Sequence, residues 1–284
     1  MATINPPKSA IGSPILHRLK VGSKSLKLSI YESSDNFTFF IGGHDLFCID
    51  AMIDKPDSIL ADRGFDISQG YLSHIYYNIN CSLNSNFERG IDTNMILLLL
   101  ISYIKDNYNH IKTIRMTDTS SRVCDNGHSV ELPLMYYIRT GKTWYESNFH
   151  AYMDEDDAIK FNREEEKFQN IKSSITWNNM KSYISEDMPL PEEEMHDLFE
   201  SAKIWQDFFG PLSNRTGISK FCIFIAPWIH RFMGAFFRFN FGSAKYIIPL
   251  NKIPQLEYSI TRYSRGGKKY TRKLWRSKAP KNET

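Results

Sequence analysis

The sequence has few cysteines, and none of them stands near another. The four are Cys48, Cys81, Cys124 and Cys222. Cysteine-rich zinc modules need cysteine pairs spaced about two to four residues apart, so this spacing excludes one and argues against a disulfide framework. Scattered cysteines are typical of a reducing compartment. We therefore expect an intracellular protein, in the cytoplasm or, for a viral protein, in the particle.

Long apolar runs are also lacking. The longest uncharged apolar stretch, FCIFIAPWIH at residues 221–230, is much shorter than the roughly 20 residues that a membrane helix needs. The first residues, MATINPPKSAIGSP, lack the basic segment and the apolar segment that mark a secretory signal. Hydrophobic residues make up 42% of the 284, which is enough for a protein core. We expect a chain that does not enter a membrane.

Positive charge is present but unevenly distributed. The net charge of the chain is +3, whereas the segment from Tyr258 to Thr284 carries nine basic residues and one acid, a net charge of +8, which leaves −5 for the rest. Basic side chains neutralise phosphates, and interleaved aromatic rings can stack on unpaired bases. We predict that this tail binds nucleic acid or an acidic protein partner; the alternative is a tail that only increases solubility or docks on the acidic body. The predicted contact residues are Arg262, Arg265, Lys268, Lys269, Arg272, Lys273, Trp275 and Arg276.

The pattern of apolar residues predicts a chain of mixed α/β type. Alternating residues predict strands over 25–33, 37–43, 44–53, 71–83, 111–118 and 142–153. Helical periodicity and capping residues predict helices from Asp92 or Thr93 to Asn107, over 132–141, within 154–184, and from Pro191 to Gly210. Residues 119–131 are expected to form a polar loop, and residues 215–260 are aromatic and β-prone. The predicted regions are an arm (1–20), an α/β domain (21–155), a helical then β-rich region (156–260) and the basic tail (261–284).

The stretch NFERGIDTNMILLL, residues 86–99, places a glycine turn between a predicted strand and an apolar helix. The order from residue 71 to 153 is strand, glycine turn, helix, strand, short helix, strand. This order resembles the central half of the GNAT acyltransferase fold, in which a (Q/R)xxGxG(A) turn holds the pyrophosphate of acetyl-CoA on backbone amides. The resemblance implies a GNAT-like mixed sheet with flanking helices. It also implies an acetyl-CoA contact at Leu83, Arg89, Gly90, Ile91, Asp92, Thr93 and Asn94.

Asp92 departs from that pattern, because it stands where the family has its second glycine, and Phe87 stands where glutamine or arginine is usual. Two like charges about 4 Å apart repel by roughly 4 kcal/mol at an effective dielectric constant near 20, so a carboxylate beside a diphosphate weakens binding unless Arg89 compensates. Aspartate is also a preferred N-cap. We interpret Asp92 as an N-cap without a cofactor; the alternative is a variant loop that still binds one.

The resemblance also implies a tyrosine that protonates the departing thiolate. Tyr137 has a Y-x-x-x-G spacing to Gly141, and Tyr145 lies in WYESNF, a gapped match to the family's YExxGF element. Glu88 or Asp118 would act as the base. Cys124 and His128 are of zinc-ligand types, but a zinc site needs further ligands, so we predict no metal.

Two hypotheses follow from the sequence. In the first, the chain is a GNAT-like binding or assembly protein with a degenerate acyl-CoA site, and it attaches to a partner through its basic tail. In the second, it is an active acyl-CoA-dependent N-acyltransferase.

Overall fold

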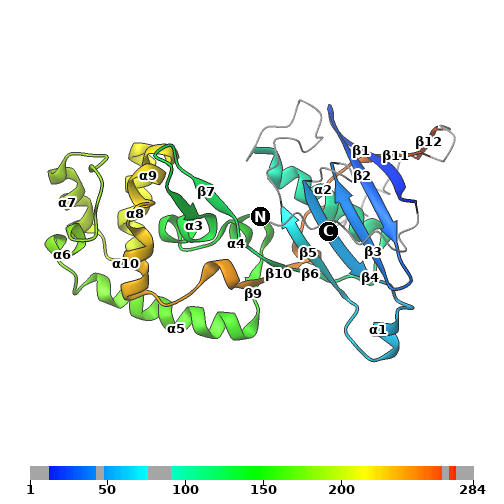
Figure 1. Cartoon of the computed structure of the whole chain (residues 1–284), viewed down its shortest axis with the longest axis horizontal. Helices are drawn as coiled ribbons and strands as arrows, with labels where there is room; N and C mark the ends of the chain where they lie inside the picture. Colours follow the sequence, from blue (N-terminus) through cyan, green and yellow to red (C-terminus); the bar gives the residue numbers. More distant parts are fainter. Residues whose placement is uncertain (1–12, 43–47, 76–90, 264–268, 273–284) are drawn as a thin grey trace, which may run out of the picture. The chain divides into compact units, whose positions relative to one another are not determined.

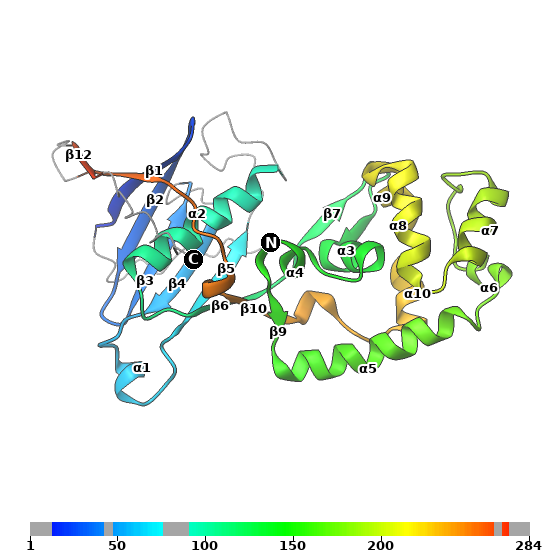
Figure 2. The ribbon, with the colours of Figure 1, turned by 180° about the vertical axis from the view of Figure 1, so that it is seen from behind.

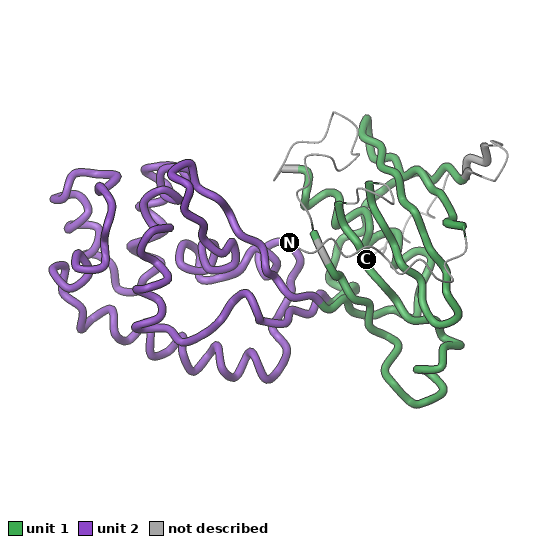
Figure 3. The backbone as a smooth tube through the Cα atoms, viewed as in Figure 1, with its two compact units in different colours: residues 1–115, 249–284 green, residues 116–248 purple. Residues whose placement is uncertain are grey.

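The structure, a computed structural model, describes residues 13–42, 48–75, 91–263 and 269–272. The chain forms two compact units (Figure 3). Unit 1 comprises residues 1–115 and 249–284, and unit 2 comprises residues 116–248. The chain leaves unit 1 in strand β6 (Thr113–Thr117) and returns to it in strand β10 (Lys245–Pro249).

Unit 1 contains a mostly antiparallel sheet and one long helix (Figure 1). Its strands lie in the order β12-β11-β1-β2-β3-β4-β5-β6. Neighbouring strands from β12 to β5 are antiparallel. The elements of this unit are β1 (Ile15–Val21), β2 (Lys24–Glu32), β3 (Asn36–Ile41), β4 (Ile49–Asp54), α1 (Ile59–Asp62), β5 (Gln69–Ile75), α2 (Ile91–Asn107), η2 (Leu250–Lys252), β11 (Ser259–Tyr263) and β12 (Lys269–Arg272).

Strands β5 and β6 run parallel. The Lys112 N–H donates to the Ser68 carbonyl oxygen at 2.7 Å, and a Cβ on Gly70 would lie 3.5 Å from the Ile114 side chain. Lys112 lies beside Ser68, and Ile114 lies beside Gly70, so the residue numbers increase in the same direction along both strands, as in a parallel pair. A parallel pair needs a crossover connection, and the segment between β5 and β6 contains α2.

Apolar side chains explain how α2 and the sheet hold together. Helix α2 covers one face of the sheet (Figure 2). Its residues Leu97, Leu100 and Ile104 are fully buried, because nearly the whole helix surface is apolar and must be covered. The ring centroid of Tyr103 on α2 lies 6.2 Å from that of Phe39 on β3. The Tyr103 hydroxyl lies 3.0 Å from Nδ1 of the buried His17 on β1.

Unit 2 is mainly helical. The elements of this unit are β7 (Ser121–Val123), β8 (Ser129–Glu131), α3 (Leu132–Thr140), α4 (Trp144–Phe149), β9 (Tyr152–Met153), α5 (Glu155–Lys172), α6 (Trp177–Lys181), α7 (Glu192–Ser201), α8 (Trp205–Thr216), α9 (Ile218–Ile225), α10 (Ile229–Phe236) and η1 (Phe241–Ser243). Strands β7 and β8 form an antiparallel hairpin, and β9 pairs with β10. The core is built from large rings, among which Phe168, Trp205 and Phe232 contact one another with centroids 4.9–6.0 Å apart.

The structure confirms a mixed α/β protein with a sheet followed by a helical region, and it confirms helix α3 between Pro133 and Gly141. Several predictions of individual elements were wrong. Residues 215–260 are not mainly β: α9 and α10 lie there, because Phe221, Ile225, Trp228 and Phe232 recur at helical spacing and bury one face.

The predicted strand over 142–153 is replaced by α4. Thr143 caps this helix: its side chain accepts from Glu146 N–H, and Glu146 accepts from Thr143 N–H at 2.5 Å, a capping box that starts a helix. The predicted loop over 119–131 holds the β7–β8 hairpin, and β1 occupies residues that were assigned to the N-terminal arm. The predicted helix from Pro191 to Gly210 is two helices, α7 and α8, separated at residues 202–204.

The prediction against disulfides is also wrong. Cys124 and Cys222 are bonded, with their Cα atoms 5.6 Å apart, inside the usual range for a disulfide. Cys48 is disulfide-bonded as well. The spacing of the cysteines therefore no longer supports the inference of a reducing compartment. In the part of the chain that the structure describes, no helix has the length and apolarity needed to cross a membrane.

Candidate functional site

The first turn of α2 is the place where the sequence predicted an anion site. Helix α2 begins at Ile91, so Asp92 lies inside the first turn and is not the N-cap. This corrects the N-cap interpretation. Leu83, Phe87, Glu88, Arg89 and Gly90 lie outside the described residues.

Asp92 is buried, with 5% of its surface exposed, and its Oδ1 atom lies 2.5 Å from Nζ of Lys24. Lys24 is the first residue of β2, so the pair joins the sheet to the start of the helix. A helix N-terminus carries partial positive charge and stabilises a carboxylate. The first turn of α2 therefore already holds an anion, and this anion belongs to the protein.

Among the described residues of this turn, the charge of Asp92 opposes the pyrophosphate of acetyl-CoA. A diphosphate at the first turn would meet the Asp92 carboxylate, and like charges about 4 Å apart repel by roughly 4 kcal/mol at an effective dielectric constant near 20. Lys24 is already bound to Asp92, and Arg89, the cation that the sequence offered to offset this repulsion, lies outside the described residues. Thr93 and Asn94 are half-buried in the same turn and carry no charge.

Tyr145 and Asp118 lie in one buried polar cluster of unit 2, together with Tyr246 of β10. The exposed fractions of all three residues are 5% or less. The rings of Tyr145 and Tyr246 have centroids 6.3 Å apart. Asp118 follows β6 and accepts from the Ser120 N–H at 3.0 Å. Tyr246 was not predicted as a member, since nothing local in the sequence connects it to Tyr145.

Burial governs the protonation of this cluster. It raises the pKa of the Tyr145 phenol well above its usual value, and the charge of Asp118 raises it further. Burial also raises the pKa of the Asp118 carboxyl, against the hydrogen bonds from Ser120. Buried phenols with raised pKa values stay protonated near neutral pH. Such phenols can donate hydrogen bonds to acceptors inside the protein.

Tyr137 lies apart from that cluster, in the aromatic core of unit 2. It is fully buried, and its hydroxyl donates to Oε1 of Glu165 at 3.3 Å. Its ring stacks on Phe237 with centroids 5.4 Å apart. Burial raises the pKa of Tyr137, and the negative charge of Glu165 adds to this effect. Its surroundings are those of a packing residue.

Cys124 is committed to its disulfide with Cys222, so its sulfur is not available to bind a metal or to act as a nucleophile beside His128. Among the described residues, no group of three or more histidine, cysteine or acidic side chains is placed to hold a metal ion.

The basic tail begins as part of the sheet. Arg262 is exposed on β11, and the backbone of Lys269–Arg272 pairs with Ile260–Tyr263 as strand β12. The boundary expected at residue 261 therefore falls inside a strand. The other predicted contact residues, Arg265, Lys268, Lys273, Trp275 and Arg276, lie outside the described residues.

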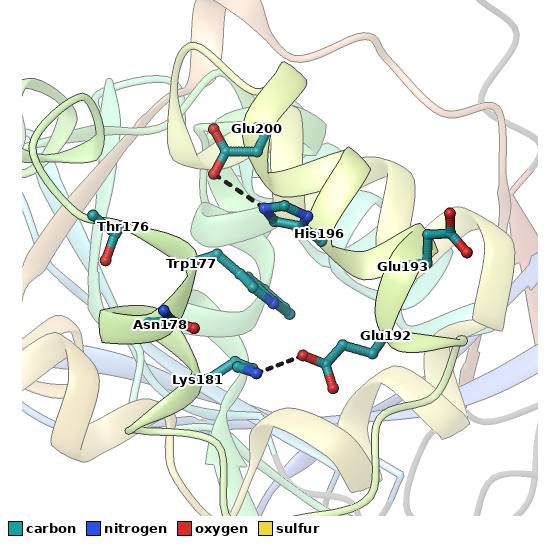
Figure 4. A pocket seen from close by; sticks show the side chains of 8 residues that line it. All are labelled: Thr176, Trp177, Asn178, Lys181, Glu192, Glu193, His196 and Glu200. Carbon is teal, nitrogen blue, oxygen red and sulfur yellow. Dashed lines mark hydrogen bonds and ion pairs between the residues drawn. The ribbon is translucent and has the colours of Figure 1, made fainter.

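Unit 2 also contains two surface hollows that the sequence did not predict. The first has a volume of about 570 Å³ and lies between α6 and α7 (Figure 4). Trp177 stands in its middle, next to two ion pairs: Lys181–Glu192 at 2.5 Å and His196–Glu200 at 3.5 Å. Its lining contains one lysine, Lys181, against three acids, Glu192, Glu193 and Glu200, so acidic side chains predominate. The acids of α7 resemble ordinary first-turn acids in the sequence, so only the fold reveals their arrangement.

The second hollow has a volume of about 530 Å³ and lies between α5 and the end of α10. Its charged side chains are Arg163, Glu164, Lys167 and Arg238, so it carries a net charge of +2. Arg238 lies far from the others in the sequence, which hid the cluster from sequence reasoning.

We compared the chain with known proteins. No family model, curated protein or solved structure matches it.

Proposed function

We propose that this chain is a binding or assembly protein, built on a GNAT-like strand–helix–strand unit in which an internal carboxylate takes the place of a bound cofactor phosphate. The observation that carries the proposal is the ion pair between Lys24 and Asp92 at the start of α2. The basic C-terminal segment attaches the protein to nucleic acid or to an acidic partner.

The order of elements supports the GNAT-like part of the proposal. Strand β5, helix α2 and strand β6 follow one another in the order that suggested the resemblance, and α3 is the short helix expected after them; the β7–β8 hairpin before α3 and helix α4 after it depart from that order. The charge at the start of α2 supports the loss of the cofactor. In a phosphate-binding turn the backbone amides face an external anion, whereas here Asp92 fills the same first turn and is neutralised from the sheet.

The test is a thermal unfolding experiment with millimolar acetyl-CoA. A ligand at 100 times its Kd adds about 2.7 kcal/mol to the free energy of unfolding. We expect no stabilisation of the wild-type protein, and stabilisation of Asp92→Gly, in which the repelling charge is removed. Asp92→Asn is the matched control that removes the charge but keeps the side chain. Pantetheine, which lacks the diphosphate, should stabilise none of these proteins. Stabilisation of the wild-type protein by acetyl-CoA would overturn the proposal.

The role of the tail needs a variant that spares the sheet. Deleting residues 261–284 would remove β12 and most of β11. Replacing Lys273, Arg276, Lys278 and Lys281 with glutamine removes four charges without touching either strand. We expect this tail variant to lose most of the salt-sensitive retention on immobilised nucleic acid. Equal retention of the tail variant and the wild type would show that the basic residues from Lys273 to Lys281 are not the attachment site.

The alternative function is an active N-acyltransferase. It is favoured by the proximity of Asp118 and Tyr145, two residue types that such chemistry uses. Their burial and the charge of Asp92 count against it. Release of free thiol from acetyl-CoA by the wild-type protein, lost in Tyr145→Phe, would favour this alternative over the binding protein.

A further inference from the structure

The basic hollow of unit 2 is formed by one face of α5 and the segment that follows α10, which lie side by side (Figures 1 and 2). Arg163 and Lys167 are on α5, and Arg238 follows α10. The apolar part of the hollow is formed by Ile171 and Phe236.

Glu164 organises the positive charges. Its residue is 7% exposed, and its Oε1 atom accepts from Arg163 Nε at 3.2 Å and from Lys167 Nζ at 3.0 Å. Its Oε2 atom lies 3.4 Å from the backbone N–H of Arg238, which donates to it. The single carboxylate is therefore buried beneath three cationic residues. The side chains of Arg163 and Lys167 remain 65% and 62% exposed, so their remaining N–H groups face outward.

Arg238 contributes a positive charge that forms no ion pair among the described residues. Within the described part of the chain, its guanidinium makes no ion pair or hydrogen bond, and its only hydrogen bond is through the backbone. An arginine fork matches the geometry of phosphate oxygens, and charge-assisted hydrogen bonds of this kind are the strong ones. The unpaired guanidinium beside two further cations is suited to an anionic phosphate group.

Phe236 offers an aromatic surface for the apolar part of a ligand. Its ring is half-buried and contacts the rings of Phe232 and Tyr183, with centroids 5.2 and 5.6 Å away. A fixed, partly exposed ring beside cations is the arrangement that stacks a planar base while the cations hold its phosphate. The volume of about 530 Å³ is within the usual range of roughly 300–1,000 Å³ for small-ligand sites.

We propose that this hollow binds the phosphate of a nucleotide, with the base against Phe236 and the phosphate held by Arg163, Lys167 and Arg238. The nucleotide is either free or part of a single strand, since both present the same chemistry. This site uses none of the tail residues, so it is independent of the proposed role of the tail.

The test is fluorescence anisotropy with a labelled ten-nucleotide oligothymidylate, with AMP as the competitor. The full-length tail variant described above is the background, so that binding by the tail does not mask the hollow. We expect Arg238→Ala to weaken binding about tenfold, and Phe236→Leu to weaken it by a similar factor. Lys220→Ala, which removes an exposed lysine on α9, should leave the affinity unchanged.

Arg238→Ala is the cleanest variant because Glu164 keeps both of its side-chain partners. Arg163→Gln with Lys167→Gln is the second variant, and its unfolding temperature is measured alongside its affinity. For single strands, the slope of log K against log salt concentration falls by about 0.7 for each phosphate that the protein no longer neutralises, so this double variant should show a shallower slope. Displacement of the oligothymidylate by AMP assigns the site to free nucleotides, and binding without displacement assigns it to a single strand.

Two results would overturn the proposal. One is equal affinity of the tail variant with and without Arg238→Ala. The other is a tail variant that binds neither probe, which would reject the hollow while leaving the role of the tail intact. A third result would separate the two proposals. If the tail variant binds as tightly as the wild type and the hollow variants do not bind, the proposed role of the tail is rejected and the proposed site in the hollow is supported.

Discussion

The Nζ atom of Lys24 lies 2.5 Å from Oδ1 of Asp92, across a separation of 68 residues. The contact holds the first turn of α2 against the beginning of β2. Because Asp92 is almost completely buried, the two residues depend on each other.

We expect Lys24→Met to destabilise the protein, because it removes the ion pair between Lys24 and the buried carboxylate of Asp92. The loss should be on the order of 2 kcal/mol, between the values for exposed and fully buried pairs. Asp92→Asn combined with Lys24→Met should recover much of it. Urea unfolding of the four proteins of this double-mutant cycle gives the coupling energy. A coupling energy near zero would mean that the contact does not contribute.

The disulfide between Cys124 and Cys222 should stabilise unit 2 strongly. It closes a loop across 98 residues of sequence, and the chain-entropy model gives about 4.7 kcal/mol for a loop of that size, within a measured range of about 2–5. Cys124→Ser with Cys222→Ser should lower the urea midpoint by a corresponding amount. Reduction by dithiothreitol should lower the urea midpoint of the wild type by more than that of the variant, because the variant has no bond between residues 124 and 222 to reduce. Alkylation of Cys124 in the native, unreduced protein would contradict the prediction.

Unfolding free energy should fall between pH 6.5 and pH 4 because of His17. Burial, and then the charge of Arg262, lowers the pKa of His17 from 6.5 to about 4. The folded state therefore holds a neutral imidazole while the unfolded state takes up a proton in this window. Stability from this group is complete above pH 6.5 and is lost as the pH falls toward 4, by about 3 kcal/mol in total. His17→Gln keeps a hydrogen-bonding group for Tyr103 but does not titrate. Its pH profile should be flatter than that of the wild type, and parallel profiles would refute the assignment.

Gly210 should not tolerate a side chain. A Cβ there would lie 2.9 Å from the carbonyl oxygen of Arg139, so α8 packs directly on α3. Gly210→Ala gains about 1 kcal/mol of helix propensity, but the clash should outweigh it and give a net loss of about 1–2 kcal/mol. Gly234→Ala in α10 is the matched control, since a Cβ there meets nothing within 4 Å. Thermal unfolding should therefore show opposite signs for the two substitutions.

The sequence predicted elements whose signals are local. The strands near residues 25–33 and 37–43, the helix that ends near Asn107 and the short helix between Pro133 and Gly141 all follow from alternation, periodicity and capping residues. Short apolar runs such as residues 221–230 fit a strand or a buried helix equally well. There the prediction failed, because the packing partners that decide the outcome are distant.

The candidate sites depended on distant contacts even more. Lys24 and Asp92, Cys124 and Cys222, and Arg163 and Arg238 are brought together only by the fold. The sequence identified Asp92 as the deciding residue of its turn, but it could not supply the cation. Tyr145 and Asp118 were proposed from the sequence as an acid and a base; the sequence did not predict that both are buried.

Unit 1 is interrupted by unit 2, and the two ends of the interruption meet: the N–H of Leu250 donates to the carbonyl oxygen of Lys112 at 2.9 Å. This connectivity has a consequence for synthesis on the ribosome. All of unit 2 is translated before β11, so unit 2 can complete its fold while β1 still lacks its neighbour. Until β11 arrives, β1 presents an open edge that can pair with another chain. The time needed to translate the helical unit is therefore the interval in which the nascent sheet is most exposed to misassembly.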